Sequence, residues 1–296
     1  MNSRENDVHT KEVFITLVSN RGRNIRIRID RPEILGGATA LIFNGEPKEE
    51  EFVKNPLTNE NIPVIKGTDT RFLIPAHIKE DYEYATANNM PIKQVIAPYF
   101  LGTGEETVRD NVETQNRHSV IAIIKHNEED KYLCLDCKGR SCKSFVLGGI
   151  EPNEGAEQAA IREVYEETGY SNIVIDRKSR FKIINHFYAG YKGVNRYAVL
   201  EIVFGRLADE MCEEISEEES KKHVVKWIDK NELIDFISVN NNRYALEMLL
   251  NGETAWIGDG VMINSGKLNG VKSQQVGKIL TDMLLKDKEE IEIWLH

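Results

Sequence analysis

The chain has 296 residues, of which 41% are hydrophobic, and a formal net charge of −10 at pH 7. The hydrophobic share excludes a largely disordered chain, and the length predicts one large or two modest domains. The acidic balance disfavours non-specific binding to nucleic acid or anionic lipid. The start, MNSRENDVHTK, lacks the apolar stretch of a secretory signal, and aliphatic runs such as VIAII at 120–124 are too short to span a bilayer. We therefore expect a soluble cytoplasmic protein that binds neither membrane nor DNA.

The first hundred residues are predicted to form short strands joined by polar turns. Strands are expected within 12–45, in EVFITLVS, NIRIRID and ATALIFNG. A loop-rich stretch follows over 56–75, then a short helix over 81–89 and an extended PIKQVIAPYF. The polar segment LGTGEETVRDNVETQN, at 101–116, is predicted to be a linker.

From residue 117 the pattern changes to longer apolar strands. Strands are predicted in HSVIAIIKH, KYLCLDC, CKSFVLGG, RFKIINHFYAGYKG, NRYAVLEIVFGRL and VVKWID. Helices are predicted from about Ala156 to Thr168 and in KNELIDFI and RYALEMLL, and the segment EEISEEESKK is expected to be an acidic loop. Over 252–296 we expect a Gly-rich turn and an amphipathic helix around GKILTDMLLK. The chain is thus predicted to be an α/β domain between two segments of another character.

Four cysteines are present, at Cys134, Cys137, Cys142 and Cys212, and the first two form a CxxC. This spacing admits a zinc or redox site. Residues three apart on a strand face opposite sides, however, and no second CxxC or histidine pair stands nearby. Ordinary thiols on a β-hairpin are therefore favoured.

Residues 148–170, GGIEPNEGAEQAAIREVYEETGY, crowd carboxylates into one turn and one helix. At about 100° per residue, Glu163, Glu166 and Glu167 fall within one arc of this helix. The side chains opposite this arc, which we expect to pack on a sheet, are Ile161, Val164, Tyr165 and Thr168.

Three carboxylates at this spacing repel one another, so a purely structural helix gains nothing from them. A divalent cation would turn the repulsion into coordination, because hard carboxylate oxygens suit Mg²⁺ or Mn²⁺. The Gly148–Gly149 turn is placed to supply a backbone carbonyl to the same ion, and Arg162 to hold Glu154 or a helix carboxylate from behind. The alternative is a surface helix whose acidic face is merely solvated.

The spacing fills every fixed position of the Nudix box, with Gly148, Glu154, Arg162-Glu163, Val164, Glu166-Glu167, Gly169 and Tyr170. The region of about 117–240 therefore resembles the Nudix hydrolase family. This resemblance implies an α/β/α sandwich. It also implies cleavage of a nucleoside diphosphate linked to another moiety, with Mg²⁺ or Mn²⁺ as the cofactor.

Carried over position by position, the resemblance implies metal ligands at Glu163, Glu166 and Glu167, and we predict the backbone carbonyl of Gly148 as a further ligand. It implies catalytic roles for Glu166 and Glu163, with Arg162 and Glu154. The general base stays open between a helix glutamate and one from the later acidic segment, namely Glu214, Glu217, Glu218 or Glu219. Many family members enter the box through Leu-Pro-Gly-Gly, whereas this chain has FVLG at 145–148. This departure leaves the substrate class open.

The flanking segments resemble the editing domain of leucyl-tRNA synthetases. The matching stretches are RPEILGGATALI, NPLTNENIPV, FLIPAHIKEDYEYATANNMPIKQVIAP and GDGVMINSGKLNG, in family order. The resemblance implies a substrate-binding pocket in which Asp81 holds the amino group of a mischarged amino acid and His77 lies nearby. The family's threonine pair is replaced by Ile29 and Asp30, and an isoleucine has no hydroxyl to position water. Alternatively, Asp81 caps the helix that follows it.

We therefore predict a Nudix domain over 113–244, inserted in a discontinuous, β-rich, editing-like α+β barrel domain formed by 1–112 and 245–296. The predicted function is Mg²⁺-dependent hydrolysis of a small nucleotide substrate. The alternatives are the editing region of a leucine-tRNA ligase, with aminoacyl-tRNA as partner, and a non-catalytic module that binds a nucleotide or aminoacyl nucleotide. The sequence has no His-Ile-Gly-His or Lys-Met-Ser-Lys-Ser signature, so this chain alone is not expected to charge tRNA.

Overall fold

The computed structural model describes residues 13–139 and 141–286. By its internal contacts the chain divides into two compact units. The discontinuous unit takes in the described residues up to 96 and from 254 on, and the continuous unit comprises 97–253. The sequence-based domain limits at 112/113 and 244/245 stay a prediction. No helix in the described part of the chain is both long enough and apolar enough to cross a membrane.

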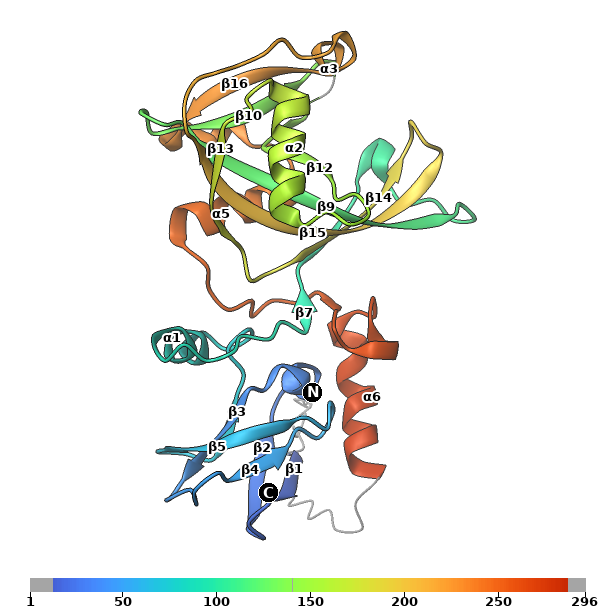
Figure 1. Cartoon of the computed structure of the whole chain (residues 1–296). Coiled ribbons are helices and arrows are strands. Elements are labelled where there is room, and N and C mark those ends of the chain that lie inside the picture. Colours follow the sequence, from blue (N-terminus) through green and yellow to red (C-terminus); the bar gives the residue numbers. More distant parts are fainter. Residues whose placement is uncertain (1–12, 140, 287–296) are drawn as a thin grey trace, which may run out of the picture. The chain divides into compact units, whose positions relative to one another are not determined.

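The discontinuous unit is rich in strands, and its sheets are open (Figure 1). An antiparallel hairpin consists of β1 (Val13–Val18) and β2 (Asn24–Ile29). A four-stranded sheet in the order β4-β5-β3-β6 contains β3 (Ala40–Asn44), β4 (Phe52–Lys54), β5 (Asn61–Gly67) and β6 (Arg71–Leu73). The other elements are η1 (Pro32–Gly37), α1 (Lys79–Ala87), β7 (Ile96–Ala97), β17 (Val261–Met262), η4 (Gly266–Leu268) and α6 (Ser273–Lys286).

One core unites the two stretches of the discontinuous unit. Ile15 and Ile27 of the hairpin and Leu41 of β3 are buried together with Val276 and Leu280 of α6. The stretch 56–75 was expected to be loop-rich, and this was wrong, because it contains β5 and β6. Residues 61–64 of β5 alternate between exposed and buried, which is the signature of a half-buried strand.

The continuous unit is built on a nine-stranded sheet with the path β11-β10-β9-β15-β14-β8, to which β12, β13 and β16 add. Its strands are β8 (Tyr99–Leu101), β9 (Thr114–Lys125), β10 (Lys131–Cys137), β11 (Lys143–Ser144), β12 (Val146–Gly149), β13 (Ile173–Lys178), β14 (Ile183–Ala189), β15 (Val194–Leu207) and β16 (His223–Asp229). The longest contact is the parallel pairing of β9 with β15. Its helices are η2 (Gly104–Glu106), α2 (Ala156–Thr168), α3 (Glu217–Lys222), η3 (Lys230–Glu232), α4 (Leu233–Phe236) and α5 (Asn240–Asn251).

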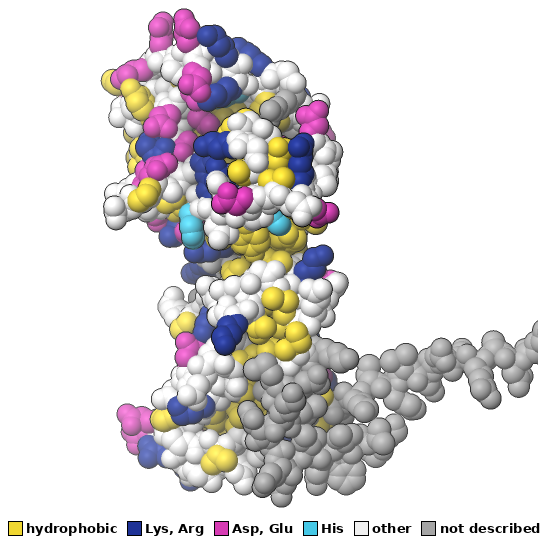
Figure 2. All heavy atoms as spheres, turned by 90° about the vertical axis from the view of Figure 1, so that its right-hand side faces the viewer, with side chains coloured by type: hydrophobic (Ala, Val, Ile, Leu, Met, Phe, Trp, Pro, Cys, Tyr) yellow, Lys and Arg dark blue, Asp and Glu magenta, His cyan; other side chains and the backbone are white. Residues whose placement is uncertain are grey.

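Helices lie on both sides of this sheet, with α2 on one face and α5 behind it (Figure 1). The α2 face is held by an apolar cluster that includes Val120 and Ala122 of β9, Val203 of β15 and Val164 of α2. This confirms the predicted α/β/α sandwich. Acidic and basic side chains are interspersed on the face of the unit drawn in the upper part of Figure 2, rather than gathered into one basic field.

Two segments of the continuous unit differ from the sequence-based expectation. The acidic segment 213–222 is not wholly loop, because it contains α3, whose first turn is capped by the Ser216 hydroxyl accepting from Glu219 N at 3.2 Å. The segment 101–116, expected to be a linker, packs onto the sheet. Gly102 N donates to His186 O at 2.8 Å, and Asn195 Nδ2 donates to Arg109 O at 2.9 Å.

Candidate functional site

The buried face of α2 differs from the predicted one, and the difference brings carboxylates inside. The buried residues of the helix are Ala156, Ala159, Ala160, Val164 and Thr168. Tyr165, which was expected to pack on the sheet, is 42% exposed. On a helix of about 100° per residue, Glu163 and Glu167 fall in the middle of this buried arc. The small alanines let the helix lie close to the sheet, so both carboxylates point between helix and sheet.

Gly148 makes room for the first of these carboxylates. It lies in β12, opposite Val120, and not in the expected turn. A Cβ atom built on Gly148 would lie 1.8 Å from Cδ of Glu163, so the missing side chain is the space that the Glu163 carboxylate fills. The Glu163 side chain is accordingly only 13% exposed.

Glu167 is the most unusual ionisable group of the site. Its Oε2 atom is buried and has no hydrogen-bond partner among the described residues. Burial, together with the negative charges of Glu163 and Glu219, raises the pKa of Glu167 to about 8, against the opposing effects of Lys222 and of the Leu147 backbone. A buried carboxylate oxygen without a partner is costly, so the site is organised for a positive group that would compensate it.

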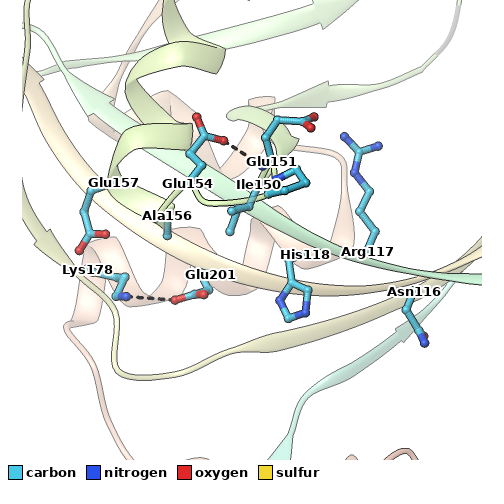
Figure 3. A pocket seen from close by; sticks show the side chains of 12 residues that line it. Asn116, Arg117, His118, Ile150, Glu151, Glu154, Ala156, Glu157, Lys178 and Glu201 are labelled. Carbon is cyan, nitrogen blue, oxygen red and sulfur yellow. Dashed lines mark hydrogen bonds and ion pairs between the residues drawn. The ribbon is translucent and has the colours of Figure 1, made fainter.

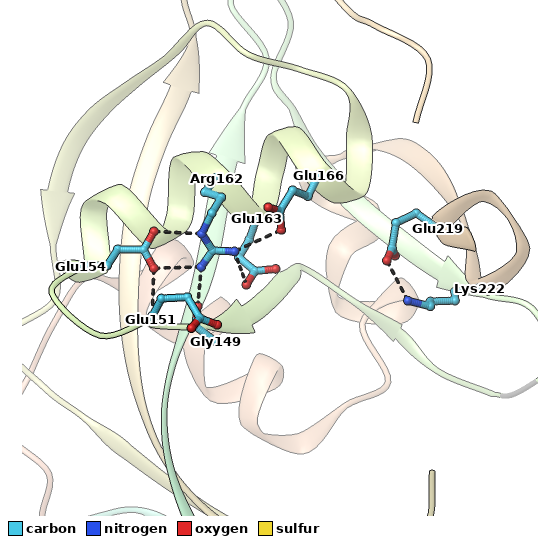
Figure 4. Close-up of polar contacts among 8 residues, drawn as sticks. All are labelled: Gly149, Glu151, Glu154, Arg162, Glu163, Glu166, Glu219 and Lys222. Carbon is cyan, nitrogen blue, oxygen red and sulfur yellow. Dashed lines mark hydrogen bonds and ion pairs between the residues drawn. The ribbon is translucent and has the colours of Figure 1, made fainter. Parts of the chain in front are cut away.

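Arg162 ties the acidic residues together (Figure 4). Its Nε and Nη2 donate to the two oxygens of Glu154, both at 2.9 Å, and Nη2 also donates to Gly149 O at 2.7 Å. Its Nη1 donates to Glu163 Oε1 at 2.9 Å and to Glu166 Oε2 at 3.1 Å. The bidentate guanidinium, followed by the Glu151 backbone N–H, lowers the pKa of Glu154 to about 2. Arg162 thus holds both Glu154 and the helix carboxylates, and it uses the Gly149 carbonyl.

The donor set fits a hard divalent cation. Glu163, Glu166 and Glu167 offer only carboxylate oxygens, which Mg²⁺ and Mn²⁺ prefer. In the described residues no three acidic, histidine or cysteine side chains already surround one point closely enough to hold an ion. Arg162 Nη1 bonds both Glu163 and Glu166, so these carboxylates would turn from it toward Glu167 to share a metal.

Of the four later glutamates, Glu219 is the one directed toward this site. Its side chain is 21% exposed, whereas those of Glu217 and Glu218 are 91% and 81% exposed. Lys222 Nζ donates to Glu219 Oε1 at 2.7 Å (Figure 4). His223 Nε2 lies 2.8 Å from Glu167 O, so α3 and the start of β16 are attached to the C-terminal end of α2. Sequence reasoning missed Lys222, because only the capped helix brings this side chain to Glu219.

A cleft of about 600 Å³ opens at the N-terminal end of α2 (Figure 3). It is lined by residues of β9, β13, β15, the loop before α2 and the first turn of α2, among them Arg117, His118, Ile150, Glu157, Lys178 and Glu201. Lys178 Nζ pairs with Glu201 at 3.2 Å. The Arg117 guanidinium lies over Gly149, where a Cβ atom would be 2.2 Å from its Nη2. Of the residues that line the cleft, Glu154 was predicted as a site residue. Arg117, Lys178 and Glu201 were not predicted, because they come from strands far apart in the sequence.

The two residues predicted for an editing-like pocket have their polar atoms engaged within the protein. Asp81 is 0% exposed, and its Oδ2 accepts from Ile74 N at 2.7 Å. Its Oδ1 makes no hydrogen bond among the described residues, but it has an ion-pair partner in Arg71 Nη1 at 2.7 Å. Asp81 does not cap α1, since Ile78 occupies the N-cap position. These contacts hold Asp81 inside the protein, and its predicted role in a substrate pocket stays a prediction.

His77 is likewise an internal residue, at 1% exposure. Its Nδ1 lies 3.0 Å from Trp256 O, and its Nε2 accepts from Val95 N at 3.0 Å. Burial lowers the pKa of His77 to about 4, so the ring is neutral. Both ring nitrogens are thus engaged within the protein, and the predicted role of His77 in a substrate pocket stays a prediction.

Comparisons with known proteins point to two families. Residues 116–248 match the family model of the NUDIX domain. The leucine-tRNA ligase of Fervidobacterium nodosum is 46% identical over 139 residues, which are 44% of this chain and 14% of that protein. The leucine-tRNA ligase of Crocosphaera subtropica is 34% identical over 97 residues, 29% of this chain and 10% of that protein. The chain thus spans about one seventh or less of the length of these relatives.

Solved structures similar to part of the chain include a NUDIX hydrolase from Nitrosomonas europaea, with a TM-score of 0.36 and 21% identity, covering 48% of this chain and 93% of that one. A C. elegans Ap4A hydrolase has a TM-score of 0.34 and 19% identity, covering 44% of this chain and 94% of that one.

Proposed function

We propose, from the premise that residues 116–248 form a NUDIX domain of the pyrophosphohydrolase type, that the chain hydrolyses a nucleoside diphosphate linked to another moiety with Mg²⁺ or Mn²⁺. The observation that carries the proposal is the unpartnered, buried Oε2 of Glu167 next to Glu163. A helix that merely presents a solvated acidic face would have no reason to bury that oxygen.

In this proposal, some residues of the chain bind the cation and others position those ligands. Glu163, Glu166 and Glu167 would hold the cation, together with the Gly148 carbonyl. Such a cation neutralises phosphate charge and lowers the pKa of a bound water. Arg162, fixed by Glu154, sets the positions of Glu163 and Glu166, as partners of metal ligands commonly do.

The 600 Å³ cleft beside the box is the proposed place for the remainder of the substrate. Arg117 and Lys178 offer cationic groups there for phosphate oxygens. The match to the NUDIX model supports a small nucleotide as the substrate class, and Ap4A and ADP-ribose are sensible first members of a panel.

The test is release of phosphate or nucleotide from a panel of nucleoside diphosphate derivatives during a Mg²⁺ titration. Wild type should be metal-dependent, and Glu166→Gln should lose about 10²–10⁴ in kcat/KM. Glu128→Gln, which removes an exposed charge from the same unit, is the matched control and should retain wild-type rates. Equal rates for wild type and Glu166→Gln that do not change across the Mg²⁺ titration would refute the proposal.

Glu219 is the proposed general base among the later glutamates, because it alone of the three on α3 is largely shielded. Its carboxylate would take the proton from the attacking water, while Lys222 holds it in place. Glu219→Gln should lower kcat by about 10² or more and flatten the acidic limb of its pH profile. Glu217→Gln serves as the control, and an equal effect of the two substitutions would assign the base elsewhere.

A second candidate function rests on the similarity to leucine-tRNA ligases. Under it, the discontinuous unit contributes to hydrolysis of mischarged aminoacyl-tRNA. The assay is loss of the aminoacyl ester from mischarged leucine tRNA. Rates at the uncatalysed background would exclude it for this chain. Ligand-dependent thermal shifts without any product would instead favour the binding module.

A further inference from the structure

Three of the four cysteines fall in or beside the hairpin of β10 and β11, and the fold separates them into two kinds. Cys134, in the middle of β10, is 0% exposed, and burial raises its thiol pKa to about 12. Cys137 and Cys142 lie at the hairpin end and are partly exposed. The CxxC formed by Cys134 and Cys137 is therefore no functional pair, because residues three apart on a strand project from opposite faces.

The strand register instead sets Cys137 against Cys142. Leu135 pairs with Ser144 and Asp136 pairs with Lys143, so the next pair outward is Cys137 with Cys142. The N–H of Cys137 donates to the carbonyl of Cys142 at 2.8 Å, which continues the ladder. Directly opposite residues of a hydrogen-bonded antiparallel pair share one face and have Cα atoms about 5.5 Å apart. A disulfide spans Cα separations of about 4.4–6.8 Å, so this pair can close with little backbone movement.

The same hairpin end is attached to α3. Cys137 pairs on its other side with His223 of β16. The next residue, Lys138, donates from its backbone N to Lys222 O at 2.8 Å and from Nζ to Ser220 O at 2.6 Å. The cysteine pair therefore lies one residue from the contacts that hold the C-terminal end of α3.

We propose that Cys137 and Cys142 form a thiol–disulfide site that reacts with low-molecular-weight disulfides such as oxidised glutathione, and that the bond stiffens the hairpin end holding α3. One cysteine thiolate attacks the glutathione disulfide, which forms a mixed disulfide and releases one glutathione thiolate. The second cysteine thiolate attacks the protein sulfur of that mixed disulfide. This forms the Cys137–Cys142 disulfide and releases the second glutathione as a thiolate. Each protein thiol gives up a proton to solvent, and their two electrons reduce the glutathione disulfide.

The test uses the full chain treated with oxidised glutathione and mapped as peptides without reduction. The Cys212→Ser background removes the exposed thiol outside the hairpin. In that background we expect one Cys137–Cys142 link, opened by dithiothreitol, with Cys134 unmodified. Cys142→Ser should stop at the glutathione adduct of Cys137. Separate adducts on both cysteines without a link, or one equivalent of zinc that protects both thiols, would overturn the site.

The effect on α3 has its own readout in amide hydrogen exchange. Oxidation should slow exchange several-fold over 217–222 in the Cys212→Ser protein and leave it unchanged in Cys137→Ser. Exposed amides of α1 serve as the internal reference. Unchanged exchange in an oxidised, linked protein would refute the coupling to α3. Neither measurement depends on nucleotide hydrolysis, so failure of the proposed enzymatic activity would leave this result interpretable.

Discussion

Both units bury ionisable groups, but in one unit the charged or polar atoms of these groups have partners and in the other an oxygen has none among the residues that the structure describes. In the discontinuous unit, His77 and Asp81 are almost fully enclosed, and their polar atoms face backbone groups and the Arg71 guanidinium. In the continuous unit, Glu167 has a buried oxygen with no partner in the described structure, and a neighbouring negative charge at Glu163.

This difference separates structural polar groups from chemical ones. A buried group whose polar atoms all have a hydrogen-bond or ion-pair partner stabilises one conformation and has little left to offer a ligand. A buried group left incomplete costs stability, and such a cost is typical of sites where a ligand or ion completes the set. Burial of a titratable residue alone would not have distinguished the two regions.

The largest effect is expected from replacing Glu167, whose buried Oε2 has no hydrogen-bond partner among the described residues. Glu167→Gln should lower kcat/KM by about 10²–10⁴, because a carboxylate of the metal site is lost. Because the pKa of Glu167 is raised in the folded protein, wild type loses folding stability as the pH rises above the ordinary pKa of a glutamate. Glu167→Gln lacks this cost, so with a chelator at pH 7 it should be more stable than wild type by about 1–2 kcal/mol. Activity assays and thermal unfolding measure the two effects. A variant that is both active and less stable would show that Glu167 is structural.

A smaller effect on activity is expected from filling the space beside Gly148. Gly148→Ala puts a methyl where Glu163 Cδ lies, and the end of that flexible side chain would be displaced. We expect kcat/KM to fall by about 10–100-fold with little change in thermal stability. Gly139→Ala, where a Cβ atom would meet nothing within 4 Å, is the control for stability alone, although its positive φ adds strain. Wild-type activity in Gly148→Ala would contradict the placement of Glu163.

In the discontinuous unit, substitution should affect stability and not hydrolysis. Asp81→Ala leaves Ile74 N without its acceptor and removes one of the two carboxylate partners of Arg71, which should cost about 2–3 kcal/mol in the free energy of unfolding. Glu80→Ala, at the exposed neighbouring position, should change it little. Denaturant unfolding measures both. Below its melting temperature, Asp81→Ala should hydrolyse nucleotide at the wild-type rate. A loss of activity without a loss of stability would contradict a purely structural role for Asp81.

At neutral pH the smallest expected effect is that of His77, because its contribution to stability changes only on acidification. Its pKa is lowered from 6.5 to about 4 in the folded protein. The unfolded chain therefore takes up a proton first as pH falls, so the stability present above pH 6.5 is lost progressively toward pH 4, by about 3 kcal/mol in full. Unfolding curves for wild type and His77→Gln between these pH values test it. Parallel pH dependences would show that His77 is not the group responsible.

The sequence predicted where the helix of the Nudix box begins and ends more accurately than how that helix packs. The helix of 156–168 was predicted at its observed bounds, because Gly169 ends it with a left-handed φ of 82° and carboxylate spacing marks its turns. The face on which that helix packs was predicted wrongly. Apolar residues such as Tyr165 were given more weight than alanines, although only small side chains allow the observed close approach to the sheet.

The sequence also could not show which glutamate of the acidic segment 213–222 is shielded from solvent. Glu217, Glu218 and Glu219 are neighbours in one acidic run, and only the helical turn capped by Ser216 directs Glu219 away from solvent. The cleft residues Arg117, Lys178 and Glu201 meet because β9, β13 and β15 share a sheet. Sequence periodicity carries no information on such pairings between distant strands.

The sequence by itself determined the local features of this protein: the box spacing, the helix that carries it, and the change of pattern between the segments. These follow from neighbouring residues, whose propensities and repulsions act within one or two turns. Only the tertiary structure decided which carboxylate lost its solvent, that His77 and Asp81 were satisfied internally, and that Cys137 pairs with Cys142 rather than with Cys134. Burial and strand register depend on contacts between segments far apart in the chain, and those contacts set the electrostatic environment of each group.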